Sequence, residues 1–496
     1  MLDFVKPIIS LRLITSLLLI SGIFNMQTHA DTIKTNKNNH YLMTRDYYDN
    51  LITSNEFPIA ELGMLANILP KGGDIHHHFI GAIYAETLLD YVKKEGFCID
   101  PNSYQILKKP TKTSMTVDEI RADIPKYNQL LSVWSTENFS NHSHEQLAPD
   151  ERFFDCFNYF AWVEDYIIQD GLIDLKKRAE AENVQYIETI FPFAPVSTNV
   201  ALDDINKLTS NTDDLTINQV LEKAMLLLDQ DKVIHQAITH YSTIVTDKSK
   251  GIDNDQFTMR FQPYVFRGSK PSMVFSGLYS AFSLAQNNHK IVGVNIVGAE
   301  HLVVAINDYT LHMKMFRFLK QKFPNVKLSL HAGELALGQV PPEGLTHHIR
   351  DAVLIAGANR ISHGVDIMHE SNPYQLINTL LEKNILIEIN LTSNEFILGI
   401  AGNDHPIKLY MRYGVPIAIC TDDAGVSRHN LTQEYLLFIS RYKPSYDQLK
   451  QVVYNSIKYS FLTEEEKKKQ LNLLDNKFIL FEENIALHSK TMQEKK

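Results

Sequence analysis

Cysteine is scarce in this sequence, with three cysteines in 496 residues. Three is an odd number, and it is too few for a disulfide framework that holds a small fold together. Cys98 and Cys156 bracket a polar segment, so either they form a disulfide that closes this segment as a loop, or they are two separate thiols. Cys420 lies in an apolar run, which favours a free buried thiol.

The sequence also lacks an excess of basic residues. It has 48 Lys and Arg against 58 Asp and Glu, a formal net charge of −10. A negatively charged chain repels a phosphate backbone, so we expect no nucleic-acid partner. A hydrophobic content of 44% and an aromatic content of 10% are those of a globular protein with a large core. A small-molecule ligand needs no particular net charge and remains open.

Long apolar runs are absent except near the start. Lys6 and Arg12 precede the run "LITSLLLISGIF", which has 12 residues and ends at Phe24, and Ala30 follows as a small residue suited to cleavage. A membrane span needs about 20 residues, so this pattern predicts a signal peptide at 1–30, with an uncleaved anchor as the alternative. We therefore expect an exported protein, periplasmic or extracellular, that is soluble and without membrane contact after cleavage.

The rest of the chain alternates between short apolar runs and helical patterns. Strict alternation of this kind is typical of a parallel sheet, and eight strands predict a TIM (β/α)8 barrel. No repeat of 20–50 residues indicates a solenoid. We expect a helical arm at 31–69 and a barrel at 70–496, with an insertion at 97–156 and C-terminal helices at 430–496. The expected strands lie at 73–78, 184–191, 257–267, 290–298, 326–334, 359–365, 384–394 and 415–423.

Ionisable residues recur at the carboxyl ends of five of these strands. One such residue alone is ordinarily a cap or a structural histidine, but five in phase point to a shared site, because in a barrel these ends converge on one face. The residues are the His76–His78 run, Glu300, His331 with Glu334, His363, and the Asp422–Asp423 pair.

The run "IHHHFIGA" contains the three consecutive histidines. Alternate side chains of a strand point to the same side, so His76 and His78 can share one ion while His77 points toward the helices. With His331 and an aspartate from the last strand, the donor set is three nitrogens and one oxygen. This set suits Zn²⁺, with Fe²⁺ or Co²⁺ as lesser options, and zinc lowers the pKa of bound water to roughly 7.

The neighbouring residues Glu334, His363 and Asp423 are available for acid–base work beside the metal. Together with the expected donor set they fit metal-assisted hydrolysis at an electrophilic carbon. The His-x-Glu and Pro-Cys-x-x-Cys signature of zinc deaminases that act on cytidine is absent. No lysine ends the fourth strand, as it would in barrel hydrolases with two bridged metals.

Six motifs lie along the chain, in the order "LPKGGDIHHHFIGA", "VGVNIVGAE", "LSLHAGE", "NRISHGVD", "LTSN" and "ICTDDAG". This series resembles that of the adenosine deaminases over roughly Pro70 to Arg428. The resemblance implies one zinc ion per chain, held by His76, His78, His331 and Asp422.

The resemblance also implies roles for the substrate contacts. Glu334 would protonate purine N1 while water adds at C6, and His363 would orient or deprotonate that water. Asp423 would bond the water or purine N7, and the N–H of Gly298 would meet N3. The expected reaction converts adenosine or 2′-deoxyadenosine to the inosine form and ammonia.

One position departs from the family pattern. The acidic residue expected two places after the second metal histidine is Ile80 here, so ribose contacts must come from elsewhere, with Trp134 and Glu137 of the insertion as candidates. A deaminase for another aminopurine, such as adenine or a modified adenosine, is therefore one alternative. The signal, arm and insertion resemble the exported adenosine deaminase growth factors. This resemblance implies a homodimer through the arm, with an arm that only packs on its own chain as the alternative. A secreted nucleoside-binding or growth-factor-like protein is the second alternative for the function.

Overall fold

The computed structural model describes residues 37–54, 58–137 and 147–494. The predicted signal peptide at 1–30 and the start of the predicted arm lie outside these residues. Eight parallel strands form one sheet in the order β1, β4, β5, β6, β7, β8, β9, β10. They are β1 (Gly72–His78), β4 (Val184–Phe193), β5 (Thr258–Phe266), β6 (Gly293–Val297), β7 (Lys327–Ala332), β8 (Arg360–His363), β9 (Leu386–Ile389) and β10 (Ile417–Ile419).

The first and last strands meet just beyond β10. The N–H of His78 donates to the carbonyl of Asp422 at 3.0 Å, and the N–H of Asp422 donates to the carbonyl of His76 at 2.9 Å. This parallel bridge joins β1 to the segment after β10, so the sheet curves round into a nearly closed barrel.

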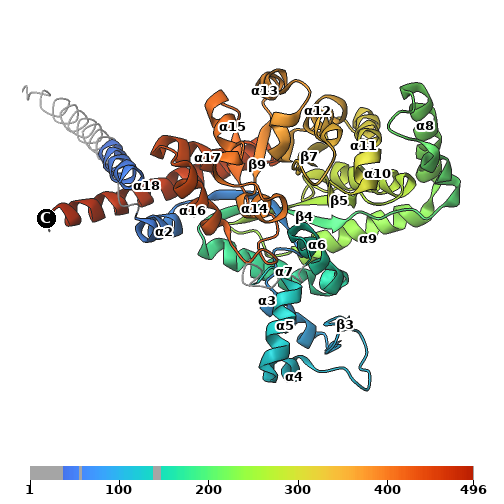
Figure 1. Cartoon of the computed structure of the whole chain (residues 1–496), viewed down its shortest axis with the longest axis horizontal. Coiled ribbons are helices and arrows are strands. Elements are labelled where there is room, and N and C mark those ends of the chain that lie inside the picture. Colours follow the sequence, from blue (N-terminus) through green and yellow to red (C-terminus); the bar gives the residue numbers. More distant parts are fainter. Residues whose placement is uncertain (1–36, 55–57, 138–146, 495–496) are drawn as a thin grey trace, which may run out of the picture.

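Helices surround this sheet, as Figure 1 shows. Strand residues such as Ile187, Ile361 and Ile389 are buried between the sheet and its helices, which is why the strands read as nearly continuous apolar runs. The predicted TIM (β/α)8 barrel is confirmed. The surrounding helices are α7 (Glu164–Ala181), α8 (Asp214–Gln230), α9 (Lys232–Lys248), α10 (Pro271–Asn287), α11 (Val303–Lys322), α12 (His348–Asp351), α13 (Pro373–Glu382), α14 (Leu391–Leu398), α15 (Ile407–Tyr413), α16 (Leu431–Tyr442) and α17 (Tyr446–Lys458).

The strand expected at 384–394 is shorter than predicted. β9 ends at Ile389, and residues from Leu391 onward form α14. The carboxylate of Glu434, from α16, accepts the N–H groups of Leu391 at 2.8 Å and Thr392 at 3.2 Å. A helix begins there because a residue far along the chain satisfies its first N–H groups, which no local pattern indicates.

After α3 (Ala85–Lys94), the segment expected as an insertion without clear periodicity contains regular structure. Its part over residues 98–134 projects from the barrel in Figure 1, whereas its last helix, at 149–160, lies beside the barrel. Thr116 and Glu119 cap α4 reciprocally, and the Asp123 side chain accepts from the N–H of Lys126 at the start of α5. Its elements are β2 (Cys98–Ile99), β3 (Ile106–Leu107), α4 (Val117–Ala122), α5 (Ile124–Trp134) and α6 (Pro149–Phe160). Cys98 and Cys156 are both buried and free, so the disulfide alternative is not realised, and Cys420 is a free buried thiol as expected.

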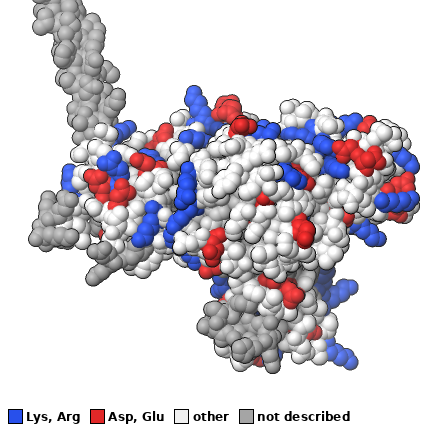
Figure 2. Space-filling view, turned by 45° about the horizontal axis from the view of Figure 1, so that its top comes forward, with Lys and Arg blue, Asp and Glu red and all other residues white. Residues whose placement is uncertain are grey.

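Both ends of the described chain lie at the same side of the barrel, where a helix over 37–53, α2 (Ile59–Ile68) and α18 (Glu464–Glu494) lie near one another in Figure 1. The Tyr48 hydroxyl donates to the carbonyl of Pro444 and the Thr44 hydroxyl to that of Glu482, each at 3.0 Å. On the face drawn in Figure 2, acidic and basic side chains are interspersed. Among the described helices, none has both the length and the apolar character needed to span a membrane.

Candidate active site

Four side chains from three parts of the barrel converge where the sheet closes. His76 and His78 end β1, His331 lies on β7, and Asp422 follows β10. One donor atom from each of the four lies within 4.8 Å of the others. His76, His331 and Asp422 are buried, whereas the His78 side chain is 15% exposed and forms the open edge of the group.

The spacing of these donor atoms fits a bound cation. His78 Nε2 lies 3.3 Å from His331 Nε2, and both His76 Nε2 and His78 Nε2 lie 3.1 Å from Asp422 Oδ1. Nitrogen ligands about 2.0–2.1 Å from zinc in a tetrahedron stand roughly 3.3–3.4 Å apart. The group therefore has the composition and the spacing of a zinc site with three nitrogens and one oxygen.

Two further side chains orient the ligating rings. His76 Nδ1 donates to Glu388 Oε2, and His331 Nδ1 donates to Asn295 Oδ1, each at 2.9 Å. With the proton on Nδ1, each ring turns the lone pair of Nε2 toward the centre of the group. Glu388 is held in turn by Arg360, whose Nε lies 2.5 Å from its carboxylate.

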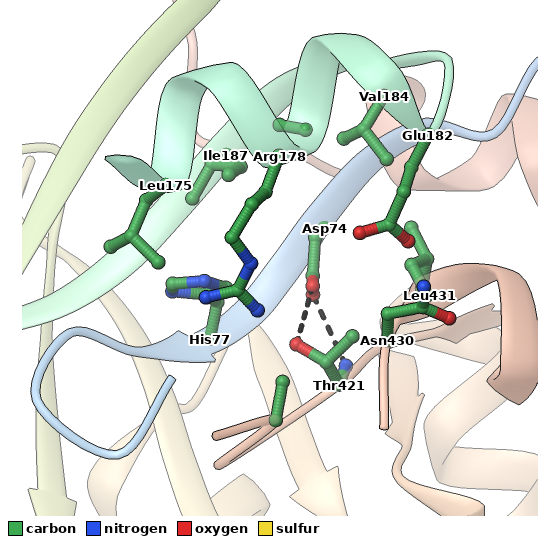
Figure 3. Close-up of a pocket in the computed structure, with 12 residues that line it drawn as sticks. Asp74, His77, Leu175, Arg178, Glu182, Val184, Ile187, Thr421, Asn430 and Leu431 are labelled. Carbon is green, nitrogen blue, oxygen red and sulfur yellow. Dashed lines mark hydrogen bonds between the residues drawn. The ribbon is translucent and has the colours of Figure 1, made fainter. Parts of the chain in front are cut away.

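His77 lies on the opposite side of β1, as predicted from strand alternation. Its Nδ1 is 3.2 Å from the hydroxyl of Thr189 on β4. Figure 3 shows its ring beside Arg178, which comes from α7, in a cavity of about 30 Å³ that Asp74 and Thr421 also line. Burial, with Arg178 adding to it, lowers the pKa of His77 to about 3, so this ring stays neutral. Its position on the opposite side of β1 keeps it out of the metal group, the set of His76, His78, His331 and Asp422.

Glu334 lies beside the metal group, three residues after His331. Burial and the charge of Asp422 raise the pKa of its carboxyl well above the usual range, which favours a protonated acid. The turn that carries it is fixed by Glu300, whose carboxylate accepts the N–H of Gly333 at 3.1 Å and of Glu334 at 2.8 Å. A divalent cation would offset the charge of Asp422, but the burial of Glu334 would remain.

His363, at the end of β8, lies beside Glu334 and Asp422. Its Nε2 is 3.6 Å from Glu334 Oε1 and 3.8 Å from Asp422 Oδ2. Its backbone has a φ of 71°, and Asp422 has a φ of 61°. Residues other than glycine seldom adopt this left-handed conformation, and such strain is concentrated at functional sites.

Asp423 completes the group of predicted residues. A Cβ on Gly81 would lie 1.6 Å from its Oδ1, so the turn after β1 admits the carboxylate only because residue 81 is glycine. Burial raises the pKa of Asp423 to about 7. Gly298, the remaining predicted residue, follows β6 with a φ of 101°, and the ring of Phe266 occupies the place where a Cβ would lie.

The structure does not favour Trp134 as a substrate contact. Its side chain is 1% exposed, and its indole N–H donates to the carbonyl of Tyr104 at 3.0 Å, within the insertion. Ile80, at the position where the family pattern has an acid, is buried in the core.

Several residues that support the site were not predicted. Glu388 and Asn295 orient the ligands, and Arg267 donates to the carbonyl of His331 at 2.7 Å and pairs with Glu300 at 3.4 Å. The available signal was a charged or amide residue inside an otherwise apolar strand, as in "LIEI" and "VNIV". Such a residue must face a polar interior, because an unpaired charge in the core is too unfavourable.

Comparison with protein families gives one matching description, adenosine deaminase, over residues 242–477. Adenosine deaminase of Clostridium perfringens strain 13 is 25% identical over 404 residues, which is 81% of this chain and 96% of that protein. Adenosine deaminase of Clostridium kluyveri is 22% identical, over 82% of this chain and 93% of that protein. A Vibrio cholerae adenosine deaminase is 33% identical over 37% of this chain and 50% of its own length.

Solved structures with the same fold include Arabidopsis ADAL complexed with IMP, with a TM-score of 0.54 and 16% identity, over 83% of this chain and 97% of that one. An amidohydrolase of Burkholderia ambifaria with bound Zn has a TM-score of 0.51 and 16% identity, over 86% of this chain and 94% of that one. The match at 242–477 contains His331, Glu334, His363, Asp422 and Asp423. Together with the curated relatives, this match shows that the chain is similar to adenosine deaminases, at modest identity.

Proposed function

We propose that this protein catalyses the zinc-dependent hydrolytic deamination of adenosine or 2′-deoxyadenosine, which gives inosine or 2′-deoxyinosine and ammonia. The family match and the curated adenosine deaminases support a hydrolase that acts on an aminopurine. Zinc is proposed as the metal because three imidazole nitrogens and one carboxylate oxygen are the donors that it prefers.

The observation that carries the proposal is the position of Glu334 beside the metal group. Its buried carboxyl favours the protonated form, because burial and Asp422 both raise its pKa. A purine ring becomes electrophilic at C6 when a ring nitrogen accepts a proton. An acid held next to four metal ligands can supply that proton where water adds.

Asp423, His363 and Gly298 are proposed to make the remaining contacts with the substrate and the water. Asp423, which is buried, has one carboxylate oxygen without a hydrogen-bond partner in the described part of the chain, so it can accept from a ligand. His363 Nε2 faces Glu334 and Asp422. The N–H of Gly298 is proposed to meet purine N3. A zinc ion held by His76, His78, His331 and Asp422 would supply Lewis acidity that lowers the pKa of water to about 7.

A second aminopurine remains a candidate substrate because of Ile80. This apolar residue replaces the acid that would contact the ribose, and it is buried. Adenine has no ribose and needs no such contact, whereas an adenosine modified at N6 keeps the ribose and differs at the reacting amine. A panel of adenosine, 2′-deoxyadenosine, adenine and N6-methylated adenosine, each compared by kcat/KM, separates these candidates.

The test compares zinc-loaded wild-type protein with Glu334→Gln. The amide keeps the size of the side chain but cannot give up a proton, so kcat should fall by at least about 10²–10⁴-fold while the metal content stays the same. The decrease in ultraviolet absorbance that accompanies deamination measures the rate. If the wild type binds zinc but converts none of the panel, the proposed function is wrong, and a secreted nucleoside-binding or growth-factor-like protein becomes the better hypothesis.

We also propose export through the signal at 1–30, as in the growth-factor-like branch, and a homodimer through the N-terminal arm. The apolar run after Lys6 and Arg12 supports the first proposal. Three exposed apolar side chains on α2, Ile59, Met64 and Ile68, support the second. Mass spectrometry of the N-terminus after expression with the leader tests cleavage, and light scattering of Met64→Glu against wild type tests the dimer.

A further inference from the structure

The tautomer of His363 is determined by a chain of hydrogen bonds that starts at a backbone N–H. The N–H of Ile407 donates to Nδ1 of His405 at 3.2 Å. A peptide N–H can only donate, so Nδ1 of His405 must carry a lone pair. The ring is 2% exposed, and with an acceptor at Nδ1 its single proton lies on Nε2.

The side-chain amide of Asn394 links the ring of His405 to the ring of His363, so the proton position on His405 determines which amide atom faces His363. Nε2 of His405 is 3.1 Å from Oδ1 of Asn394, so the N–H of the ring donates to the amide oxygen. The NH₂ group of the same amide then faces Nδ1 of His363, at 2.9 Å. The orientation of a buried amide often has two solutions, but here the fixed donor at Ile407 leaves only one.

Asn390 agrees with this assignment. Its Nδ2 is 3.4 Å from Nδ1 of His363, so two amide groups can donate to the same nitrogen. The lone pair of Nδ1 is therefore occupied, and the ring proton of His363 lies on Nε2. Nε2 is buried, and no described residue accepts a hydrogen bond from it. This N–H points at the space bounded by Glu334 and Asp422, where a reacting oxygen would satisfy it.

We infer that His405 and Asn394 are positioning residues that hold His363 with its proton on Nε2, so that the ring presents an N–H donor, not a lone pair, to the reacting water. His363 then orients the water and stabilises the negative charge that develops on its oxygen; it does not remove the proton. A base at this position would need the opposite tautomer, which the Ile407–His405–Asn394 chain opposes. The catalytic part of this inference rests on the proposed function, whereas the tautomer does not.

The experiment reverses the hydrogen-bond direction, first at His405, which does not contact His363, and then at Asn394, which does. In His405→Gln the amide accepts from Ile407 and donates to Asn394, as the histidine does. In His405→Glu the carboxylate accepts on both sides, so the Asn394 amide turns and presents its oxygen to His363. Asn394→Asp places an acceptor there directly. The first variant should keep most of kcat, whereas the other two should lose roughly 10²–10⁴-fold in kcat with little change in KM or zinc content.

Long-range ¹H–¹⁵N correlation spectra of ¹⁵N-histidine protein read the tautomer without substrate. The signals of His363 are identified by their loss in His363→Gln. The zinc-loaded wild type and His405→Gln should show Nε2–H, and His405→Glu and Asn394→Asp should show a proton on Nδ1. A wild-type ring protonated on Nδ1, or equal losses of kcat in the Gln and Glu variants, overturns the inference. A wild type with the expected tautomer but no turnover of any aminopurine would count against the proposed function alone.

Discussion

Nδ1 of His76 and Oε2 of Glu388 lie 2.9 Å apart at the centre of the barrel, and both side chains are completely buried. The same carboxylate accepts from Arg360 and from the hydroxyls of Ser329 and Ser362. One side chain on β9 therefore connects a ring of the candidate metal group on β1 to the polar interior formed by β7 and β8.

Glu388→Gln should weaken zinc binding by about 10–100-fold, because a neutral amide is a poorer acceptor for the N–H of His76 and turns an NH₂ group toward one of its donors. Competition with a chelator measures the affinity. Glu222→Gln is the matched control, since Glu222 pairs with Lys322 at the surface. An unchanged zinc affinity in Glu388→Gln would show that this contact does not support the site.

Removal of the metal should abolish activity and lower the melting temperature. Ligand binding to the folded state alone stabilises it by about 2.7 kcal/mol when free zinc is 100 times its dissociation constant. Zinc should restore both properties to chelator-treated protein, and Mg²⁺ should not, because magnesium prefers oxygen ligands. Restoration by Mg²⁺ to the same extent would contradict the assigned donor set.

Gly81→Ala should reduce kcat by about 10²-fold, because the new Cβ would lie 1.6 Å from Asp423 Oδ1 and must displace that carboxylate. Initial rates with saturating substrate measure this effect. Gly63→Ala is the control, since its Cβ meets only Leu436 at 3.7 Å, and within α2 alanine should stabilise the protein slightly. If Gly81→Ala is as active as Gly63→Ala, the position of Asp423 does not matter for catalysis.

Asp366 should make the stability of the fold fall as pH rises. Its side chain is 1% exposed, neither carboxylate oxygen has a hydrogen-bond partner among the described residues, and burial together with Glu300 raises its pKa well above 3.8. Between the unfolded and folded pKa values the folded state binds more protons, so each pH unit removes up to about 1.4 kcal/mol.

Asp366→Asn removes this dependence. Its free energy of unfolding in urea should exceed that of the wild type at pH 7.5, and the difference should disappear near pH 4. Asp255→Asn, at a side chain that is 98% exposed, serves as the control. A variant less stable than wild type at pH 7.5 would show that the carboxyl is ionised or needed as a partner.

The barrel could be predicted from the sequence because its signals are local. Apolar strands recur between helical patterns, and His331, His363 and Asp422 each stand where a strand ends. Strand alternation separates His76 from His77 in the same way. These features need only the period of a strand and the convergence of parallel strand ends.

The supporting contacts could not be predicted, because they join residues far apart in the chain. Glu434 accepts the first N–H of α14 although it lies 43 residues from Leu391 in the sequence. Arg360 donates to Glu188, 172 residues away, and to Glu388, 28 residues away. Single-sequence patterns report which face of an element is buried, but not which polar group from another element will meet it. The order within the insertion was missed for a related reason, since its short helices depend on caps such as Asp123 and not on long apolar stripes.

The bridge that joins β1 to the segment after β10 determines when, during synthesis of the chain, the metal group can assemble. The residues that close the sheet, His76 and His78 on one side and Asp422 on the other, belong to the start and the end of the barrel, and they are also members of the metal group. A nascent chain that stops before Asp422 lacks the carboxylate of this donor set. All four donor atoms can therefore meet one ion only after the segment beyond β10 has joined β1, so metal uptake would report that the barrel has closed.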